Sequence, residues 1–264
     1  MTTGNALRRR WLEEQGAIGG WCQLPSPLSA EIMGRAGFDW VCVDMQHGPT
    51  TIETASAMVQ SISVAGAVPI VRVPANDPRL IGQALDVGAS GVIVPLVNTR
   101  EEAERAAGAC RYPPVGTRSF GPVRTPGAVD SRPAAANEHV LCLVMVETRT
   151  AVENVDEICS VPGVDGIYVG PWDLSLSVGS TTPGPEIEPL LERILDACRR
   201  HGVAPGIATG SGANARARLE AGFTWVAISG DIDFLARHAR EELAAAGREP
   251  AAPAAAEGLV HVAL

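Results

Sequence analysis

Two acidic residues, each placed just after an apolar run, are the first candidates for chemistry in this 264-residue sequence. The run Val140–Val146 leads into Glu147, and the run Gly166–Val169 leads toward Asp173. Between them, Thr150–Ser160 has apolar residues at helical spacing, so the stretch predicts a strand, a helix and a parallel strand. Both carboxylates would then lie at one edge of one sheet. Oxygen ligands of this kind suit Mg²⁺ or Mn²⁺, with substrate and water completing the coordination shell.

The same two residues could instead be ordinary helix caps. Each precedes a segment with helical spacing, and an acid at the start of a helix is common because it interacts favourably with the free N–H groups there. Spacing alone therefore leaves ligand and cap equally open for Glu147 and Asp173. The choice depends on which other side chains the fold brings to the same edge.

Three further polar residues stand at the ends of apolar runs. Asp44 and His47 follow the second run, and Arg72 ends the third. A carboxylate close to a histidine can orient the imidazole and stabilise its protonated form, which indicates an acid–base pair, although a lone loop histidine is usually only solvated. Arg72 could ion-pair with an acid of the protein, but its position suits two-point binding of a substrate carboxylate.

Eight strand-like runs alternate with helical segments and begin near residues 17, 38, 68, 91, 140, 165, 203 and 224. Eight strands close a parallel barrel, and barrel enzymes carry their site at the carboxyl ends of the strands. We therefore predict an α/β protein with a (β/α)8 TIM barrel as a single domain over residues 1–246. A helix near residues 5–15 precedes it, and residues 247–264 form a low-complexity, then apolar, C-terminal extension. An open doubly wound sheet is the alternative.

The composition narrows the partners. A net charge of −9 argues against a nucleic-acid surface, because phosphate binding needs clustered Lys and Arg. No apolar run approaches the roughly 20 residues of a membrane span, and the N-terminus lacks the apolar core of a signal peptide. The six cysteines show no metal-site spacing and are expected to be buried free thiols, which indicates the cytoplasm. The expected partner is a small molecule.

Six motifs in a fixed order resemble one family. Across roughly residues 15–235 the sequence resembles the metal-dependent class II pyruvate aldolases of the 4-hydroxy-2-oxoheptanedioate aldolase and 2-keto-3-deoxy-L-rhamnonate aldolase type, which are related to the citrate lyase β subunit. The motifs are GFDWVCVDMQHGP (37–49), VRVPANDP (71–78), LDVGASGVIVPLVNTREEAE (85–104), RYPPVGTRSFGP (111–122), VMVET (144–148) and VDGIYVGPWDLSLSVG (164–179).

This resemblance implies a carbon–carbon lyase that cleaves or forms 4-hydroxy-2-oxo acids through a metal-bound pyruvate enolate. Glu147 and Asp173 would bind Mg²⁺ or Mn²⁺, with Co²⁺ as a further option. Arg72 would hold the keto oxygen, and His47, oriented by Asp44, would be the acid–base residue. The substrates would be a pyruvate-like keto acid and an aldehyde.

The resemblance also assigns residues around this centre. The backbone N–H groups of Trp172 and Asp173, after Gly170 and Pro171, would receive the substrate carboxylate at a helix start. Trp21 would line the pocket. Asp86 would lie near a subunit contact, in a homohexamer with an exchanged C-terminal segment.

Two residues depart from the family pattern. Met145 stands where many members have Gln, two residues before the metal-binding Glu, and Trp172 stands where Ala is common. A bulky ring beside the metal would reshape the space for the aldehyde, whereas the backbone N–H of residue 172 would be unchanged.

Three other functions remain open. Related enolate chemistry, such as oxaloacetate decarboxylation or CoA-thioester cleavage, would use the same centre, and Arg111, Arg118 and Arg124 could bind CoA phosphates. A non-catalytic binding protein on the same fold would not need the full set of site residues. A dinucleotide site is the weakest alternative, because Gly210-Ser211-Gly212 lacks the full glycine pattern.

Overall fold

Eight parallel strands close into a barrel in the computed structural model, which describes residues 5–124 and 132–248. Each strand pairs with the next in sequence, and β8 pairs with β1. The predicted (β/α)8 TIM barrel is confirmed, and the closed sheet rules out the doubly wound alternative. The strands are β1 (Ala17–Cys22), β2 (Trp40–Asp44), β3 (Val68–Arg72), β4 (Gly91–Val94), β5 (Leu141–Met145), β6 (Gly166–Val169), β7 (Ala204–Thr209) and β8 (Trp225–Gly230).

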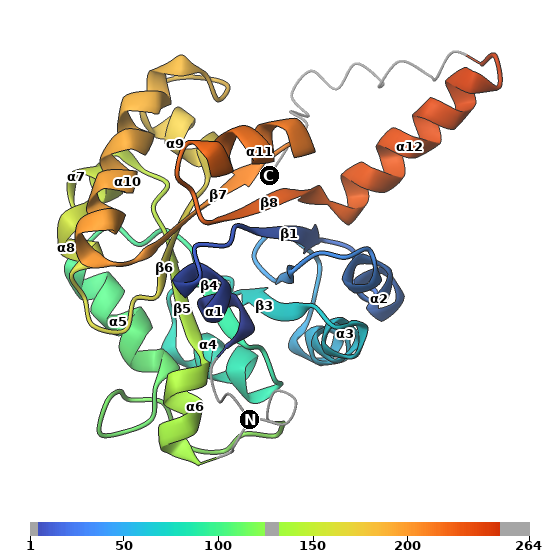
Figure 1. Ribbon diagram of the computed structural model, residues 1–264. Coiled ribbons are helices and arrows are strands. Elements are labelled where there is room, and N and C mark those ends of the chain that lie inside the picture. Colours follow the sequence, from blue (N-terminus) through green and yellow to red (C-terminus); the bar gives the residue numbers. More distant parts are fainter. Residues whose placement is uncertain (1–4, 125–131, 249–264) are drawn as a thin grey trace.

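Helices surround the barrel (Figure 1), and several of them begin at a residue whose side chain caps the helix. Thr99 and Glu102 form a capping box at one helix start, and Gly202 ends another helix in the left-handed conformation. The helices are α1 (Ala6–Leu12), α2 (Pro27–Arg35), α3 (Ile52–Ala65), α4 (Pro78–Asp86), α5 (Arg100–Cys110), α6 (Pro133–His139), α7 (Arg149–Glu153), α8 (Val155–Cys159), α9 (Pro171–Ser177), the 3-10 turn η1 (Pro185–Ile187), α10 (Glu188–His201), α11 (Gly212–Glu220) and α12 (Asp231–Ala245).

Tryptophan rings fill the interior of the barrel. Trp40 and Trp225 are fully buried, with ring centroids 5.3 Å apart. Each faces a glycine on the neighbouring strand, because Gly19 is in register with Trp40 and Gly206 with Trp225. A Cβ atom would lie 2.0 Å from the Trp40 ring at position 19 and 2.2 Å from the Trp225 ring at position 206. The interior is therefore a packed core below the mouth of the barrel.

The amino ends of the strands are closed by α1 and by a polar network. Trp11 of α1 packs against Trp225, with ring centroids 5.8 Å apart. Asp165, just before β6, accepts hydrogen bonds from Arg8, from Arg111 and from the N–H of Cys142, each at 2.8 Å. These bonds join the first helix to the middle of the chain and satisfy a largely buried carboxylate.

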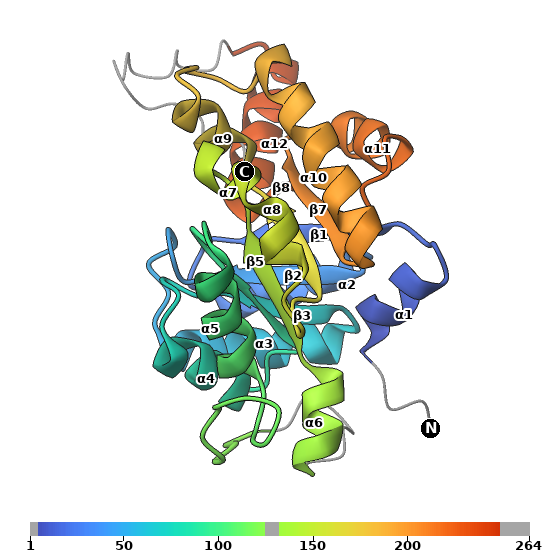
Figure 2. The same ribbon diagram turned by 90° about the vertical axis from the view of Figure 1, so that its left-hand side faces the viewer.

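One local prediction needs correction, and one short helix was not predicted. The unpredicted helix is α6, which begins at Pro133 and precedes β5 (Figure 2). The single helix expected over Thr150–Ser160 is two short helices, α7 and α8, divided at Asn154. The side-chain amide of Asn154 donates to the carbonyl of Asn98 at 2.8 Å, so it serves a tertiary contact rather than a continuous helix.

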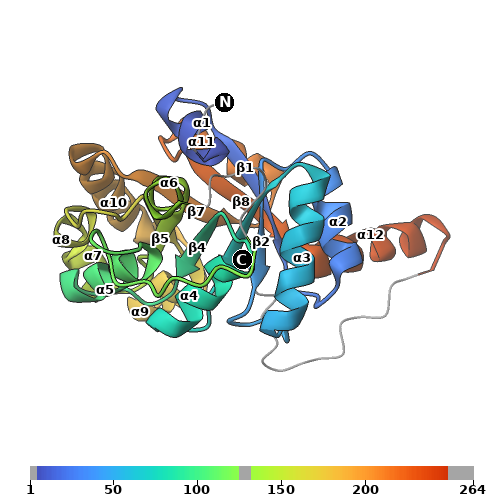
Figure 3. The ribbon, with the colours of Figure 1, turned by 90° about the horizontal axis from the view of Figure 1, so that it is seen from below.

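The last described helix, α12, extends away from the ring of helices (Figures 1 and 3). Leu235 is 62% exposed on it, and Ile232 and Leu243 are also exposed. Residues 249–264, most of the predicted C-terminal extension, lie outside the described residues. Within the described part of the chain, no helix combines the length and the apolar character needed to cross a membrane.

Candidate active site

The predicted ligand pair lies at the carboxyl ends of β5 and β6. Glu147 follows β5 and is 3% exposed, whereas Asp173 is exposed in the first turn of α9. Oε1 of Glu147 accepts a hydrogen bond from the N–H of Leu96 at 2.8 Å. A Cβ atom at residue 170 would lie 2.8 Å from Oε2 of the same carboxylate. Gly170 therefore allows the chain leaving β6 to pass close to Glu147.

The buried carboxylate of Glu147 has little compensating positive charge around it. Burial raises the pKa of Glu147 to about 7, and the charge of Asp173 acts in the same direction, against the N–H of Leu96 and the charge of Arg72. A cation beside the pair would remove this penalty. Among the described residues, no three His, Cys, Asp or Glu side chains gather as a metal cluster. Two carboxylates would thus leave the other positions to substrate and water, the arrangement typical of Mg²⁺.

A buried ion pair joins the ends of β2 and β3. Nε and Nη2 of Arg72 donate to the two carboxylate oxygens of Asp44 at 2.9 and 2.6 Å. Burial alone would raise the pKa of Asp44. The hydrogen bonds and the charge of Arg72 outweigh this effect and lower the pKa. The guanidinium carbon also lies 4.9 Å from the centre of the Trp21 ring. Arg72 is therefore held rigidly, with Nη1 as the nitrogen not bonded to Asp44.

Asp44 contacts His47 through the backbone rather than through the imidazole. Its Oδ1 accepts the N–H groups of Gln46 and His47 at 3.0 and 3.2 Å. We expected the carboxylate to orient the imidazole, but among the described side chains its ion-pair partner is Arg72. Asp44 thus fixes the turn that carries His47, and the exposed imidazole lies at the cavity described next.

Most of the expected site residues line a small cavity of about 50 Å³ at the carboxyl end of the barrel, whereas Glu147 and Asp44 are not part of its lining. Trp21 forms part of its wall and stacks on Tyr168, with ring centroids 5.5 Å apart. Both departures from the family pattern, Met145 and Trp172, are in contact with this space. We call it the inner cavity; it is lined by Trp21, His47, Arg72, Met145, Tyr168, Gly170, Pro171, Trp172, Asp173 and Ala208.

The first turn of α9 leaves backbone donors at this cavity. Gly170 is the N-cap and provides no side-chain hydrogen bond, and Pro171 occupies the first helical position. The N–H groups of the next residues, Trp172 and Asp173, fall in the turn whose amides lack intrahelical partners. An anionic group can therefore accept hydrogen bonds from these two N–H groups.

Three site residues were missed by the sequence reasoning. Leu96 supplies the N–H that binds Glu147 from a left-handed conformation, φ 55°. Tyr168 and Ala208 line the inner cavity, and the buried hydroxyl of Tyr168 has no hydrogen-bond partner among the described residues. Strand periodicity could have indicated Tyr168, because Gly166, Tyr168 and Gly170 share one face of β6.

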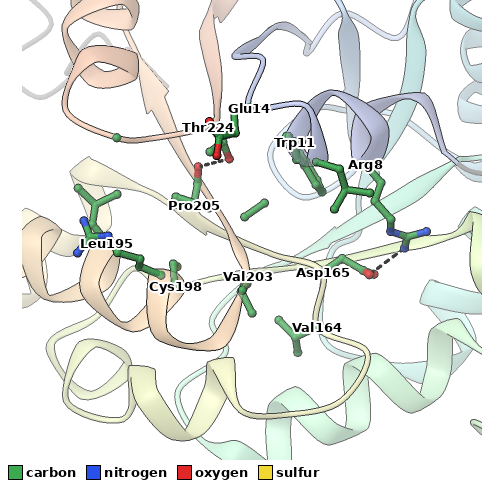
Figure 4. A pocket seen from close by; sticks show the side chains of 15 residues that line it. Arg8, Trp11, Glu14, Val164, Asp165, Leu195, Cys198, Val203, Pro205 and Thr224 are labelled. Atoms are coloured by element: carbon green, nitrogen blue, oxygen red, sulfur yellow. Dashed lines mark hydrogen bonds and ion pairs between the residues drawn. The ribbon is translucent and has the colours of Figure 1, made fainter.

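The larger cavity, about 520 Å³, lies at the opposite end of the barrel (Figure 4). It is lined by residues of α1 and by the amino ends of strands, including Arg8, Trp11 and Asp165. Two of its ionic groups, Arg8 and Asp165, are already bonded to each other. Cavity volume alone would therefore place the active site at the wrong end of the barrel.

Two of the three arginines considered for binding CoA phosphates, Arg111 and Arg118, also lie at that end. Arg111 donates to Asp165 and to the carbonyl of Gly163, each at 2.8 Å, and Arg118 donates to Asp86 at 2.6 Å. Both guanidinium groups are thus engaged away from the inner cavity, and they do not form the phosphate groove considered for a CoA thioester. The turn at Gly210–Gly212 begins α11, and Ser211 caps that helix.

The chain matches the model of the HpcH/HpaI aldolase/citrate lyase family over residues 17–239. It belongs to this family. A hydroxypyruvate/pyruvate aldolase of Rhizorhabdus wittichii is 41% identical over 91% of this chain and 98% of its own. A 5-keto-4-deoxy-D-glucarate aldolase of Escherichia coli is 36% identical over 91% and 95%. The crystal structure of a family protein from Burkholderia cenocepacia superposes with a TM-score of 0.86, at 33% identity over 92% and 100%.

Membership confirms the resemblance drawn from the six motifs and the expectation of a carbon–carbon lyase of the aldolase type. It also agrees with the closed barrel, which the family structure from Burkholderia cenocepacia shares. The relatives differ in the substrates that their names give, so the family does not by itself assign a substrate to this chain.

Proposed function

We propose that this aldolase cleaves a 4-hydroxy-2-oxo acid to pyruvate and an aldehyde, and also runs in reverse, with Mg²⁺, Mn²⁺ or Co²⁺ held by Glu147 and Asp173. The observation that carries the proposal is the burial of Glu147 beside Asp173, with a pKa raised to about 7. A bound cation would supply Lewis-acid polarisation of the substrate ketone. Oxygen ligands and the uncompensated charge fit a hard divalent ion.

Side chains and backbone groups around the inner cavity have separate roles in the reaction. Arg72, fixed by Asp44, directs its guanidinium charge at the keto oxygen, and the N–H groups of Trp172 and Asp173 donate hydrogen bonds to the carboxylate. His47 takes the proton of the C4 hydroxyl, the C3–C4 bond breaks, and C4 leaves as the aldehyde carbonyl. The electron pair remains on the enolate of pyruvate, which takes a proton at C3.

The test removes the metal and the ligands separately. Pyruvate release is measured in a coupled assay before chelation, after chelation and after Mg²⁺ or Mn²⁺ is restored. Glu147→Gln and Asp173→Asn should each abolish release, and His47→Gln should lower kcat by about 10²–10⁴. Full activity in a metal-free sample, or in Glu147→Gln, would contradict the proposed metal site.

Oxaloacetate decarboxylation is the second candidate. The inner cavity, about 50 Å³, offers room for a small keto acid and little else, which favours compact substrates. Both reactions pass through the same enolate, so they can be compared in one enzyme preparation. Faster pyruvate release from oxaloacetate than from any 4-hydroxy-2-oxo acid would make decarboxylation the main activity.

The same proposal extends to the assembly. Exposed leucine and isoleucine side chains on α12 and on α2, Leu28 among them at 65%, are the kind of surface that subunits cover. A homohexamer in which C-terminal segments are exchanged would bury the projecting α12. Light scattering should give six subunits for the native chain and fewer for Leu235→Glu, whereas a native monomer would contradict this assembly.

The proposed compartment is the cytoplasm. Cys22, Cys42, Cys110, Cys142, Cys159 and Cys198 are all buried free thiols. Such thiols are compatible with a reducing environment.

A further inference from the structure

A second cavity shares part of its wall, including Trp172, with the inner cavity. It has a volume of about 400 Å³, and we call it the outer cavity. Pro171, Trp172 and Ala208 line both spaces, so the outer cavity begins where the inner one ends. Its other walls come from the segment before α10, the end of β7 and α11. An aldol substrate needs room for two carbonyl halves, and the inner cavity alone is too small for both.

The outer cavity is lined by hydroxyl, amide and backbone groups. Thr209 is 2% exposed, and its hydroxyl donates to the carbonyl of Ala227 at 2.7 Å, which leaves the oxygen able to accept. Asn214 lies on the α11 wall; Ser211 Oγ accepts its backbone N–H, and within the described residues its side-chain amide makes no hydrogen bond. Thr182 and the backbone of Gly210 complete the polar lining.

The charges in this wall cancel. Arg218 is the one cationic side chain among the described lining residues, and its Nη1 and Nη2 donate to the two oxygens of Glu188 at 2.8 and 2.7 Å. A ligand carboxylate would have to compete with Glu188 for that guanidinium group. Hydroxyl groups, by contrast, can both donate to Glu188 and accept from Asn214 without separating the pair.

We infer that the outer cavity binds the aldehyde half of the substrate and selects a short, uncharged, polyhydroxylated aldehyde. Asn214 and the Glu188–Arg218 pair form its hydrogen-bonding wall. The aldehyde carbon would lie beside C3 of the keto acid at the wall that the two cavities share, with the hydroxyl-bearing carbons in the outer cavity. The inference rests on the proposed aldolase reaction and names the class of its second substrate.

The test compares three aldehydes in the addition of pyruvate, with the full chain and Mn²⁺. Glyceraldehyde and propanal have the same carbon skeleton and differ in hydroxyls, and succinic semialdehyde carries a carboxylate. We expect kcat/KM for glyceraldehyde to exceed that for propanal at least tenfold. Asn214→Leu should reduce this ratio by roughly three- to tenfold, as loss of one hydrogen bond does, mainly through KM for the aldehyde. Arg216→Leu, an exposed change on the same helix outside the cavity, should leave the ratio unchanged.

Deuterium exchange into the methyl group of pyruvate separates the two proposals. This exchange needs the inner cavity and no aldehyde, so Asn214→Leu should exchange at the native rate. Absence of exchange in the native enzyme would refute the aldolase mechanism itself. With exchange intact, a preference for propanal or succinic semialdehyde, or a glyceraldehyde preference unaffected by Asn214→Leu, would overturn the role of the outer cavity.

Discussion

The two ends of the barrel differ in how the charge of a buried carboxylate is compensated. At the amino end, Asp165 accepts three hydrogen bonds and two arginines share its charge. At the carboxyl end, Glu147 accepts one hydrogen bond from a backbone N–H and has a pKa raised to about 7, and the Tyr168 hydroxyl has no partner. The first arrangement stabilises the fold; the second is costly until a ligand arrives.

The larger cavity lies at the end where Asp165 is compensated, and Tyr168 lines a cavity about a tenth of its size at the other end. The poorly compensated carboxylate of Glu147 is therefore a better guide to the site than cavity volume. The contrast follows the general division of barrel enzymes between a stabilising face and a catalytic face. Three experiments test this difference between the two ends of the barrel.

The largest expected effect comes from exchanging one residue at each end. Arg72→Lys should lower kcat/KM by about 10²–10³, because an ammonium group cannot both hold Asp44 at two points and face the substrate. Asp165→Asn should cost about 1–3 kcal/mol of unfolding free energy and leave kcat/KM within about twofold. Steady-state kinetics and urea unfolding measure both. A strong kinetic effect of Asp165→Asn would show that the two ends are not separate in function.

The next effect is the pH dependence of the metal-free protein. The pKa of Glu147 is about 7 in the fold against 4.5 ordinarily, so the unfolded chain loses this proton first as pH rises. The fold should therefore lose roughly 3 kcal/mol between about pH 4.5 and 7 from this group. Glu147→Gln should remove this loss and be more stable than native metal-free protein at pH 8. Identical pH profiles for the two proteins would contradict the raised pKa.

The smallest effect concerns His139 at the amino end. It is buried, both ring nitrogens lack partners among the described residues, and burial lowers its pKa, with Arg8 and Arg9 acting in the same direction. The unfolded chain then binds a proton more readily, so the fold loses stability as pH falls below about 6.5. His139→Phe should weaken this acid destabilisation, measured as Tm from pH 7 to 5, without changing kcat.

The sequence predicted the barrel well because each strand is a short apolar run of strong periodicity. It predicted less well wherever a partner lies on a neighbouring strand. Asp44 and Arg72 are aligned across β2 and β3, a register that spacing along the chain does not contain, so His47 was assigned as the partner of Asp44. Tyr168 was missed because a sequence does not show that a buried hydroxyl lacks a hydrogen-bond partner.

The local errors have a similar origin. Asn154 divides α7 from α8 because its amide reaches Asn98, a tertiary contact that helical periodicity cannot indicate. The helix α6 was hidden because it begins at a proline, a residue that reads as a breaker but is favoured in the first turn. The chemistry of the site was nevertheless predictable, since parallel strands bring their carboxyl ends to one face.

The most direct test of the proposed metal site is to measure Mn²⁺ binding by titration calorimetry, with and without pyruvate. The titrations use buffers of different ionisation enthalpy, so that the protons released on binding can be counted. If Glu147 is a ligand, binding should release close to one proton at pH 6 and almost none at pH 8.5, because the metal needs the ionised carboxylate. Pyruvate should tighten binding, and Glu147→Gln should abolish both binding and proton release. Unchanged Mn²⁺ affinity in Glu147→Gln would contradict the assignment of the carboxyl end of the barrel as a metal and keto-acid site.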